Sequence, residues 1–230
     1  MSYLDKRVKK SVILNKGFGM IATDHIKRGT VLIKDIPFTI QQHKIYSEIF
    51  QLIYCVVNDK NKVEKFMKLQ PKSLDGYQLD KNKIENELKK VKENDIDIYN
   101  FFVSNYIFDE LLLMCAKYMS NAFDFNGKPC FLFTGTLLNH SCLPNVIFGH
   151  KDGMMVFITS KNINKGEEIC DNYVDITSPK KDRRKHLSDQ YGFECCCERC
   201  NSNKTLDHES ILIEKKRMAV FGYSKSPFVC

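Results

Sequence analysis

Four of the ten cysteines in this 230-residue chain lie within six positions, at residues 195–197 and 200. The spacing C-x-C-x-x-C lets three thiolates bind one face of a tetrahedral zinc ion. Clustered cysteines in a reducing compartment bind metal more often than they form disulfides, although an inert cysteine-rich turn is the alternative. Cys196 lies between two ligands in a tight turn, so we expect its side chain to point away. The candidates for a fourth ligand are Cys142, Cys170, His186 and His208.

Three further segments contain residue types that can bind or react. Residues 139–145 read N-H-S-C-L-P-N, residues 16–19 read K-G-F-G, and residues 166–173 read G-E-E-I-C-D-N-Y. Each is weak alone, because a polar turn with a buried histidine or a flexible hairpin turn explains the first two equally well. We interpret Glu167 and Glu168 as structural residues of a turn before a strand, rather than as catalytic carboxylates.

These residues need elements that position them. Residues 1–40 alternate short apolar runs with glycine and proline breaks, which is typical of short strands. Apolar residues at helical spacing then predict helices over about 45–57 and 81–94, and a third from an N-cap at Asp109 to about Ser120. Loops are expected near Asp59 and over 71–80.

Residues 126–175 return to strand patterns. The turn signal at residues 151–153 predicts a hairpin between residues 146–148 and 155–158. Pro179 opens a short helix that runs to about Tyr191, just ahead of the cysteine cluster. For the last 25 residues the sequence leaves two possibilities open, a docked helix or a frayed tail.

Composition excludes several classes of protein. Hydrophobic residues are 43% and charged residues 27% of the chain, which excludes wholesale disorder and a fibrous repeat. The apolar stretches fall short of the ~20 residues that span a bilayer, and the N-terminal apolar run is too short for a secretory signal. The net charge of +7 attracts acidic partners only weakly and gives no argument for direct nucleic-acid binding.

In this order, the four segments resemble those of a SET-domain protein lysine methyltransferase. The hallmarks G-x-G, N-H-S-C-x-P-N, G-E-E-[IL] followed by a tyrosine, and C-x-C-x-x-C are all present. Residues 121–123, 172–175, 183–185 and 189–195 are most similar to the SMYD (SET and MYND) branch. The resemblance covers about residues 1–40 and 100–202. It implies an α+β fold in which small β-sheets carry a helical insert and a zinc-binding post-SET segment.

The resemblance also implies a division of the chain. Residues 1–40 and 126–192 would form the SET core, and residues 41–125 a helical insert like the I-SET of the branch. Residues 193–203 would be the post-SET zinc segment and 204–230 a C-terminal tail. A MYND finger cannot be built from Cys55, Cys115 and His43, the only cysteines and histidine of the insert. Residues 204–230 are also too few for the branch's helical C-terminal domain, so we do not carry over the partner binding of those two modules.

The roles of individual residues follow from the same resemblance. The catalytic tyrosine would be Tyr173, with Phe123 and Tyr191 walling the channel for the substrate lysine. One structural zinc ion would bind Cys142, Cys195, Cys197 and Cys200. The residues expected to contact S-adenosylmethionine (AdoMet) are Lys16, Gly17, Gly19, Asn121, Asn139, His140, Tyr173 and Phe193. For Phe123, Tyr191 and Phe193, a place in the core is the alternative.

The resemblance implies methyl transfer from AdoMet to lysine side chains of a protein substrate, a histone tail or another protein. The alternatives are a catalytically silent SET module that binds protein or chromatin, and a purely structural zinc module. We expect a monomer without a membrane span. Residues 179–185 resemble a nuclear localisation signal but also read as a helix start, so nucleus and cytoplasm both remain.

Overall fold

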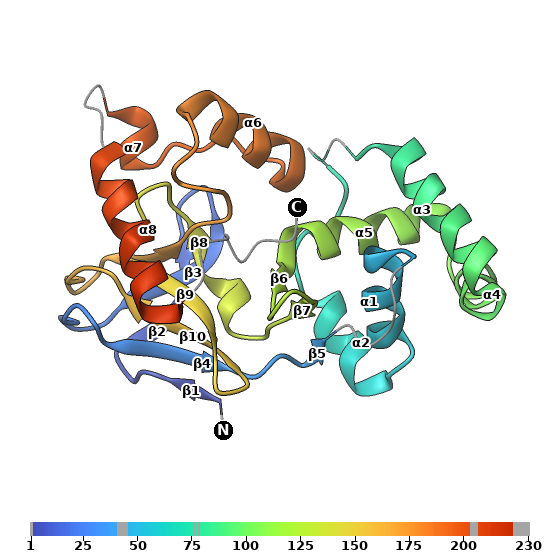
Figure 1. The fold of residues 1–230 in the computed structure, drawn as a ribbon, viewed down its shortest axis with the longest axis horizontal. Coiled ribbons are helices and arrows are strands. Elements are labelled where there is room, and N and C mark those ends of the chain that lie inside the picture. The colour runs from blue at the N-terminus through green and yellow to red at the C-terminus, as the bar shows by residue number, and fades with distance from the viewer. Residues whose placement is uncertain (1, 41–45, 76, 78, 203–206, 223–230) are drawn as a thin grey trace. The chain divides into compact units, whose positions relative to one another are not determined.

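The computed structural model describes residues 2–40, 46–75, 77, 79–202 and 207–222 (Figure 1). His43 and Cys230 lie outside the described residues. The chain packs into two compact units. The first contains the described residues up to Pro37, Leu132–Leu187, and those from Glu194 onward; the second contains those of Phe38–Phe131 together with Ser188–Phe193. The five-part division made from the sequence stays a prediction.

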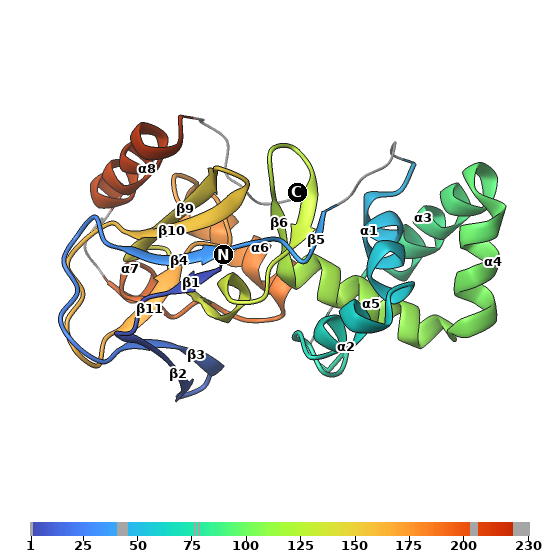
Figure 2. The ribbon, with the colours of Figure 1, turned by 90° about the horizontal axis from the view of Figure 1, so that it is seen from below.

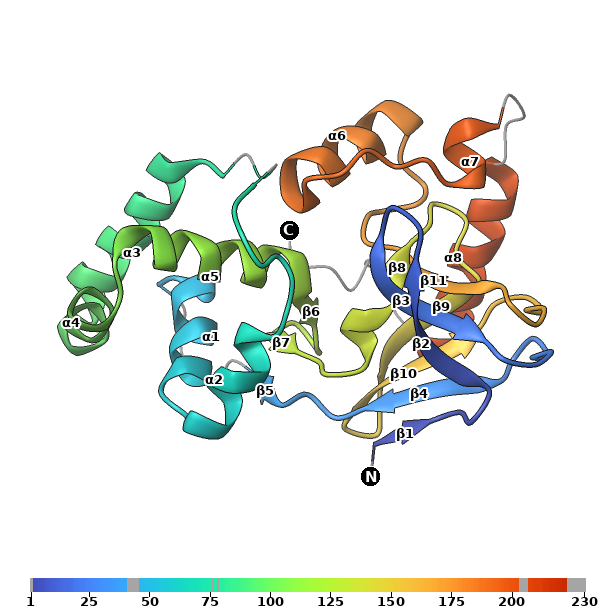
Figure 3. The same ribbon diagram turned by 180° about the vertical axis from the view of Figure 1, so that it is seen from behind.

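Two four-stranded sheets form the frame of the first unit. The first sheet has the order β1 (Tyr3–Leu4), β4 (Val31–Asp35), β10 (Met154–Thr159), β9 (Val146–Lys151). The second has the order β2 (Val8–Ile13), β3 (Gly17–Ala22), β11 (Glu168–Asp171), β8 (Asn139–His140), and Figure 3 shows it from behind. Neighbouring strands are antiparallel except β11 and β8, which run parallel with Asp171 opposite His140. Three of the motif segments therefore meet in the second sheet.

The turns of these sheets follow the sequence signals. The predicted hairpin is confirmed: β9 and β10 pair around Asp152 and Gly153, whose φ angles of 50° and 74° suit a tight two-residue turn. The β2–β3 hairpin, visible in Figure 2, turns through Asn15 and Gly17 with φ angles of 60° and 74°. Glycine adopts this left-handed backbone without steric cost, which explains Gly17 at the turn.

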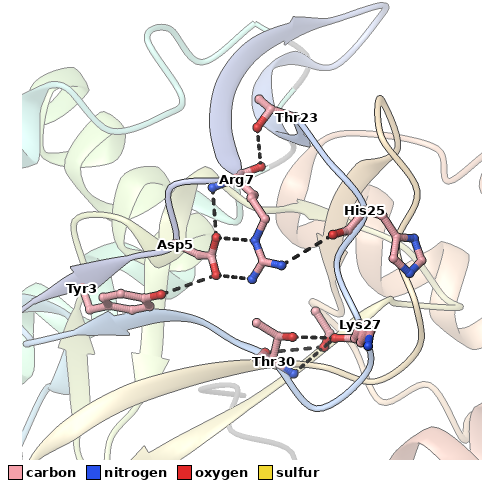
Figure 4. Close-up of polar contacts among 8 residues, drawn as sticks. Tyr3, Asp5, Arg7, Thr23, His25, Lys27 and Thr30 are labelled. Atoms are coloured by element: carbon pink, nitrogen blue, oxygen red, sulfur yellow. Dashed lines mark hydrogen bonds and ion pairs between the residues drawn. The ribbon is translucent and has the colours of Figure 1, made fainter.

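Polar contacts around the Asp5–Arg7 ion pair join the start of the chain to the segment after β3 (Figure 4). The buried Asp5 carboxylate accepts hydrogen bonds from the backbone N–H, Nε and Nη2 of Arg7 at 2.7–2.9 Å. The Arg7 carbonyl accepts from the Thr23 hydroxyl, and Nη1 reaches the carbonyl of His25. The segment between β1 and β2 is thus held against the segment after β3.

Helical elements of the first unit lie in its C-terminal half. They are the short 3-10 helix η1 (Gly135–Leu137), α6 (Lys180–Tyr191), whose last residues belong to the second unit, α7 (Glu198–Asn201) and α8 (Asp207–Phe221). The helix predicted after Pro179 is α6. Ile213 of α8 is buried in a cluster with Leu143, Ile147 and Ile176, so residues 207–221 form a docked helix and not a frayed tail.

The second unit is mostly helical. Its elements are β5 (Thr39–Ile40), α1 (Glu48–Val57), α2 (Lys60–Met67), α3 (Lys81–Asn94), α4 (Ile96–Asn105), α5 (Phe108–Asn121), β6 (Ala122–Asp124) and β7 (Pro129–Phe131). The core is aromatic, with Phe50 and Phe102 edge to face at 5.2 Å. Strands β5, β7 and β6 form a small antiparallel sheet.

The helices over 48–57 and 81–94 confirm two predictions, whereas α2 and α4 were not predicted. The prediction of Asp109 as an N-cap is wrong. The N-cap of α5 is Ile107, whose backbone N–H donates to the Glu110 carboxylate at 3.0 Å. Asp109 lies in the first turn instead, where the helix dipole stabilises a negative charge.

A buried lysine holds the loop that follows α2. The side chain of Lys117 on α5 has 1% of its surface exposed, and its Nζ donates to the carbonyls of Leu69 at 2.6 Å and Pro71 at 2.5 Å. Burial lowers the pKa of Lys117 to about 8. Asn121, one turn later, donates to the carbonyl of Gln70 at 2.5 Å. Two polar side chains of α5 therefore fix residues 69–71.

Candidate functional site

The four predicted zinc ligands meet in the first unit. The sulfur atoms of Cys142, Cys195, Cys197 and Cys200 all lie within 4.8 Å of one another, and three of the residues are buried. The turn after β8 supplies Cys142, the segment between α6 and α7 supplies Cys195 and Cys197, and α7 supplies Cys200. Four thiols at this separation fit a closed tetrahedral zinc site. Cys196 is exposed and is not part of the cluster.

Among the described residues, the cluster does not include the other candidates for the fourth ligand, Cys170, His186 and His208. Hydrogen bonds from Cys142 and Cys195 lower the pKa of the Cys197 thiol. Thiol crowding thus favours one thiolate before any metal binds, and a metal ion requires the remaining thiols to lose their protons as well.

Two arginines lie beside the cluster. Arg183 of α6 is 1% exposed, and its Nη1 donates to the Ser178 carbonyl at 2.5 Å. Burial opposes the charge of Arg183, but its hydrogen bonds and charge interactions with Cys142 and Cys200 together outweigh that cost, so the pKa of Arg183 is raised. Arg199 of α7 donates to the carbonyl of Cys142 at 3.3 Å. A buried positive charge next to the sulfur atoms compensates the negative charge of four thiolates.

The expected AdoMet residues of β3 and β8 meet at Glu168, the first residue of β11. The Glu168 carboxylate accepts from Nζ of Lys16 at 2.6 Å and from Nδ2 of Asn139 at 2.8 Å. Burial opposes the charge of Lys16, but the hydrogen bond to Glu168 and the nearby negative charges together outweigh it, so the pKa of Lys16 is raised. A Cβ at Gly19 would lie 2.6 Å from Nδ2 of Asn139, which explains the absence of a side chain there.

Tyr173 lies just after β11 and is held at two atoms. Its hydroxyl donates to the carbonyl of Leu138 at 2.6 Å, and its backbone N–H donates to Nδ1 of His140 at 2.9 Å. The two rings are 5.4 Å apart. Burial lowers the pKa of His140 to about 3. The parallel pairing of β8 and β11 thus brings the predicted catalytic tyrosine to the histidine of the N-H-S-C segment.

Asp171 is an unusual neighbour of this group. It is fully buried opposite His140 in the β8–β11 ladder, and neither carboxylate oxygen has a hydrogen-bond partner among the described residues. Burial raises the pKa of Asp171 well above its ordinary value of 3.8. The carboxyl group is therefore expected to be protonated and neutral in the folded protein.

The remaining predicted site residues belong to the second unit. Asn121 ends α5 and donates to two carbonyls, those of Gln70 and Lys117. Phe123 is buried on β6. Tyr191 ends α6 with its ring 6.4 Å from that of Phe193, which is 36% exposed. The AdoMet and substrate roles assigned to these residues stay predictions.

The residue patterns identify a family. A family model described as the SET domain matches residues 17–174, more than half of the chain. The chain belongs to the SET-domain family. A SET domain-containing protein of Acanthamoeba polyphaga mimivirus, L678, is 40% identical over 223 residues, which cover 96% of this chain and 87% of that protein.

Relatives with named activities match a shorter part of this chain. N-lysine methyltransferase SMYD2 of Homo sapiens is 30% identical over 149 residues, which cover 60% of this chain. The matched region is 34% of SMYD2, so the chain spans about a third of the length of that relative. Family membership and this similarity support a methyltransferase.

Solved structures agree on the fold. The SET domain of LSMT bound to lysine and AdoHcy superposes with a TM-score of 0.63 at 16% identity, covering 84% of this chain and 54% of that one. The predicted α+β SET fold is confirmed. Among the described residues, no helix has the length and apolar character needed to cross a membrane.

Two residues of this site are not predicted from the sequence pattern. The pattern indicates only a structural role for Glu168, although Glu168 contacts two of the predicted AdoMet residues. For Arg183 the pattern gives similarity to the SMYD branch but no role. Its signal is helical spacing, because Arg183 and Leu187 are four residues apart on α6 and are both buried.

Proposed function

We propose that the protein transfers a methyl group from AdoMet to the side-chain amine of lysine in a protein substrate. One observation carries the proposal. Residues 17–19, 139–140 and 168–173 are far apart in sequence, yet β3, β11 and β8 are consecutive neighbours in one sheet. This convergence supports a single site built from the hallmark segments of the family.

The residues of the first unit fit the amino-acid end of AdoMet. Lys16 has a side chain that is 36% exposed, so its ammonium can contact a carboxylate while it remains near Glu168. Apart from Gly17 and its chain neighbours, no heavy atom of the described residues lies within 4 Å of the point where Gly17 would carry a Cβ, which leaves its backbone accessible. AdoMet supplies an electrophilic methyl group on a sulfonium.

The protein must accept a neutral lysine amine and orient it. A free lysine has a pKa near 10.4, so deprotonation at pH 7 costs roughly 5 kcal/mol, which desolvation in an apolar channel reduces. The Tyr173 hydroxyl donates a hydrogen bond to the carbonyl of Leu138. A hydroxyl oxygen oriented in this way can direct its lone pairs toward positive charge, such as that on a sulfonium methyl group.

The test is a methylation assay with radiolabelled AdoMet on a proteome lysate, with purified protein and calorimetry of AdoMet binding. Tyr173→Phe should lower transfer about 100-fold, because only the hydroxyl is lost, and should leave AdoMet affinity nearly unchanged. Tyr3→Phe, which removes the hydroxyl of a half-exposed tyrosine on β1 of the other sheet, is the matched control. Unchanged turnover of the Tyr173 variant would refute its catalytic role, and AdoMet binding without any transfer would favour the silent module.

We further propose a monomer that acts in the nucleus or the cytoplasm. Light scattering tests the first statement. For the second, the basic residues at 180–185 form the first turns of α6, and Arg183 among them is buried. Imaging of a tagged chain with Lys180→Ala and Lys181→Ala tests whether the exposed lysines of this segment direct nuclear import.

A further inference from the structure

The imidazole of His140 lies between the cysteine cluster and Tyr173. The backbone N–H of Tyr173 donates to Nδ1 at 2.9 Å, and Nε2 lies 3.2 Å from the sulfur of Cys142. The residue is 5% exposed, so water does not compete for these two contacts. One buried ring therefore contacts a predicted metal ligand on one side and the predicted catalytic segment on the other.

The two contacts define where the ring proton resides. A backbone N–H can only donate, so Nδ1 must be the unprotonated acceptor. The neutral ring then carries its single proton on Nε2, the nitrogen that faces Cys142. A cysteine that binds zinc is a thiolate, which accepts such a hydrogen bond. The contact at 3.2 Å is thus an N–H donated to sulfur.

We propose that His140 is a positioning residue that couples the zinc site to Tyr173: Nε2–H stabilises the Cys142 thiolate, and Nδ1 holds the backbone of Tyr173. Only the consequence for Tyr173 rests on the proposed function. The contact with the metal ligand is independent of any enzymatic activity. Because both ring nitrogens of His140 are engaged in these contacts, we expect His140 to contact AdoMet through its backbone.

The groups around the predicted zinc site determine how much the zinc affinity should fall when the His140 donor is lost. Arg183 supplies the charge next to the sulfur atoms, whereas His140 supplies a neutral donor to a single sulfur. Partners of this kind, which orient a ligand without touching the metal, typically contribute about 10- to 100-fold to metal affinity. Loss of the donor should fall in this range, far less than loss of Cys142 itself.

A measurement on the unaltered chain tests the hydrogen bond. In protein loaded with cadmium-113, we expect a scalar coupling between the metal nucleus and the Nε2 proton of His140, transmitted through the sulfur of Cys142. Nitrogen chemical shifts should show a neutral ring protonated at Nε2. A ring protonated at Nδ1, or at both nitrogens, would overturn the proposal.

Two variants separate the two ends of the ring. In His140→Asn, the amide oxygen takes the place of Nδ1 and the donor to Cys142 is lost. In His140→Gln, the amide nitrogen takes the place of Nε2 and the acceptor for Tyr173 is lost. We expect zinc affinity, measured by chelator competition without AdoMet, to fall about 10- to 100-fold in His140→Asn and less in His140→Gln. In His140→Gln, the amide of Tyr173 should exchange its hydrogen faster.

His25→Asn changes an exposed histidine and is the control. Zinc affinities of both His140 variants within twofold of the unaltered protein would overturn the coupling. If His140→Asn does not fold, the cadmium measurement decides alone. Because neither readout uses methyl transfer, a failed methylation assay would leave this result interpretable, and a failed coupling would not count against the proposed function.

Discussion

Lys117→Met should unfold the helical unit at a lower temperature. The methionine keeps much of the side-chain volume on α5 but removes the ammonium that donates to the carbonyls of Leu69 and Pro71 at 2.6 and 2.5 Å. With the position 1% exposed, water cannot replace the donor. The two carbonyls would then be buried without their partner.

The size of the loss follows from these contacts. A hydrogen bond from a charged donor contributes about 1.5–3 kcal/mol, so two lost bonds amount to roughly 3–6 kcal/mol. Relief from burying an ammonium offsets part of this. We expect a net loss of about 2–4 kcal/mol, which at about 2–4 °C per kcal/mol lowers Tm by roughly 5–15 °C. Circular dichroism at 222 nm follows the helices.

The pH dependence has a definite sign. The pKa of Lys117 is about 8 in the folded protein and 10.5 ordinarily, because burial disfavours the ammonium. Between these values the unfolded chain binds more protons, so this group makes the protein more stable as pH rises. Lys117→Met lacks this gain. The difference in stability between the two proteins should therefore widen from pH 8 to pH 10.

Lys89→Met, at an exposed position of α3, is the matched control and should change Tm by no more than about 1–2 °C, the equivalent of about 0.5 kcal/mol. A Lys117→Met protein as stable as this control would refute the interpretation that the ammonium holds the loop. If the difference in stability between the unaltered protein and Lys117→Met narrows between pH 8 and pH 10, the carbonyls favour the charged form of Lys117 more than burial disfavours it.

Three other outcomes follow from the site. By elemental analysis, the Cys196→Ser protein should retain one zinc ion per chain and the Cys200→Ser protein should lose it. The reason is that Cys200 is a member of the four-sulfur cluster and Cys196 is not. Asp171→Asn should raise the free energy of unfolding by about 1–3 kcal/mol at pH 7 in urea titrations. The gain should shrink as pH falls toward the ordinary pKa of 3.8, because protonating the carboxyl group of Asp171 on folding then costs less. Gly19→Ala should cost about 1–3 kcal/mol and displace the side chain of Asn139, visible in its amide NMR signals.

Local spacing predicted the parts of the site that are close in sequence. The C-x-C-x-x-C segment identified three members of the cluster because one tight turn can carry all three thiols. Cys142 is 53 residues from Cys195, and only the family resemblance singled it out from three other candidates. Pairing of distant strands determines such contacts, and the residue pattern of one strand does not specify its neighbour.

The unpredicted helices α2 and α4 are short, at 8 and 10 residues, and each has a single buried residue, Phe66 and Phe102. Their start signals are nevertheless present. The Asp59 side chain accepts from the N–H of Asn61, and the Asp95 side chain from that of Ile98. An aspartate ahead of a polar segment is a weak signal without tertiary contacts, because it favours turns as readily as helix starts.

The ends of the helical segment lie together. The backbone N–H of Phe38 donates to the carbonyl of Phe131 at 3.0 Å, and β5 pairs with β7 at Thr39 and Phe131. The chain therefore enters and leaves this segment at two backbone positions that are hydrogen-bonded to each other. For protein engineering, a short glycine-serine loop or a foreign domain with adjacent termini can join residues 40 and 130 without stretching the flanking chain, at the cost of the predicted site residues Asn121 and Phe123. Because closure entropy grows only with the logarithm of loop length, the size of the segment is a weak constraint, and evolution is free to lengthen or shorten it.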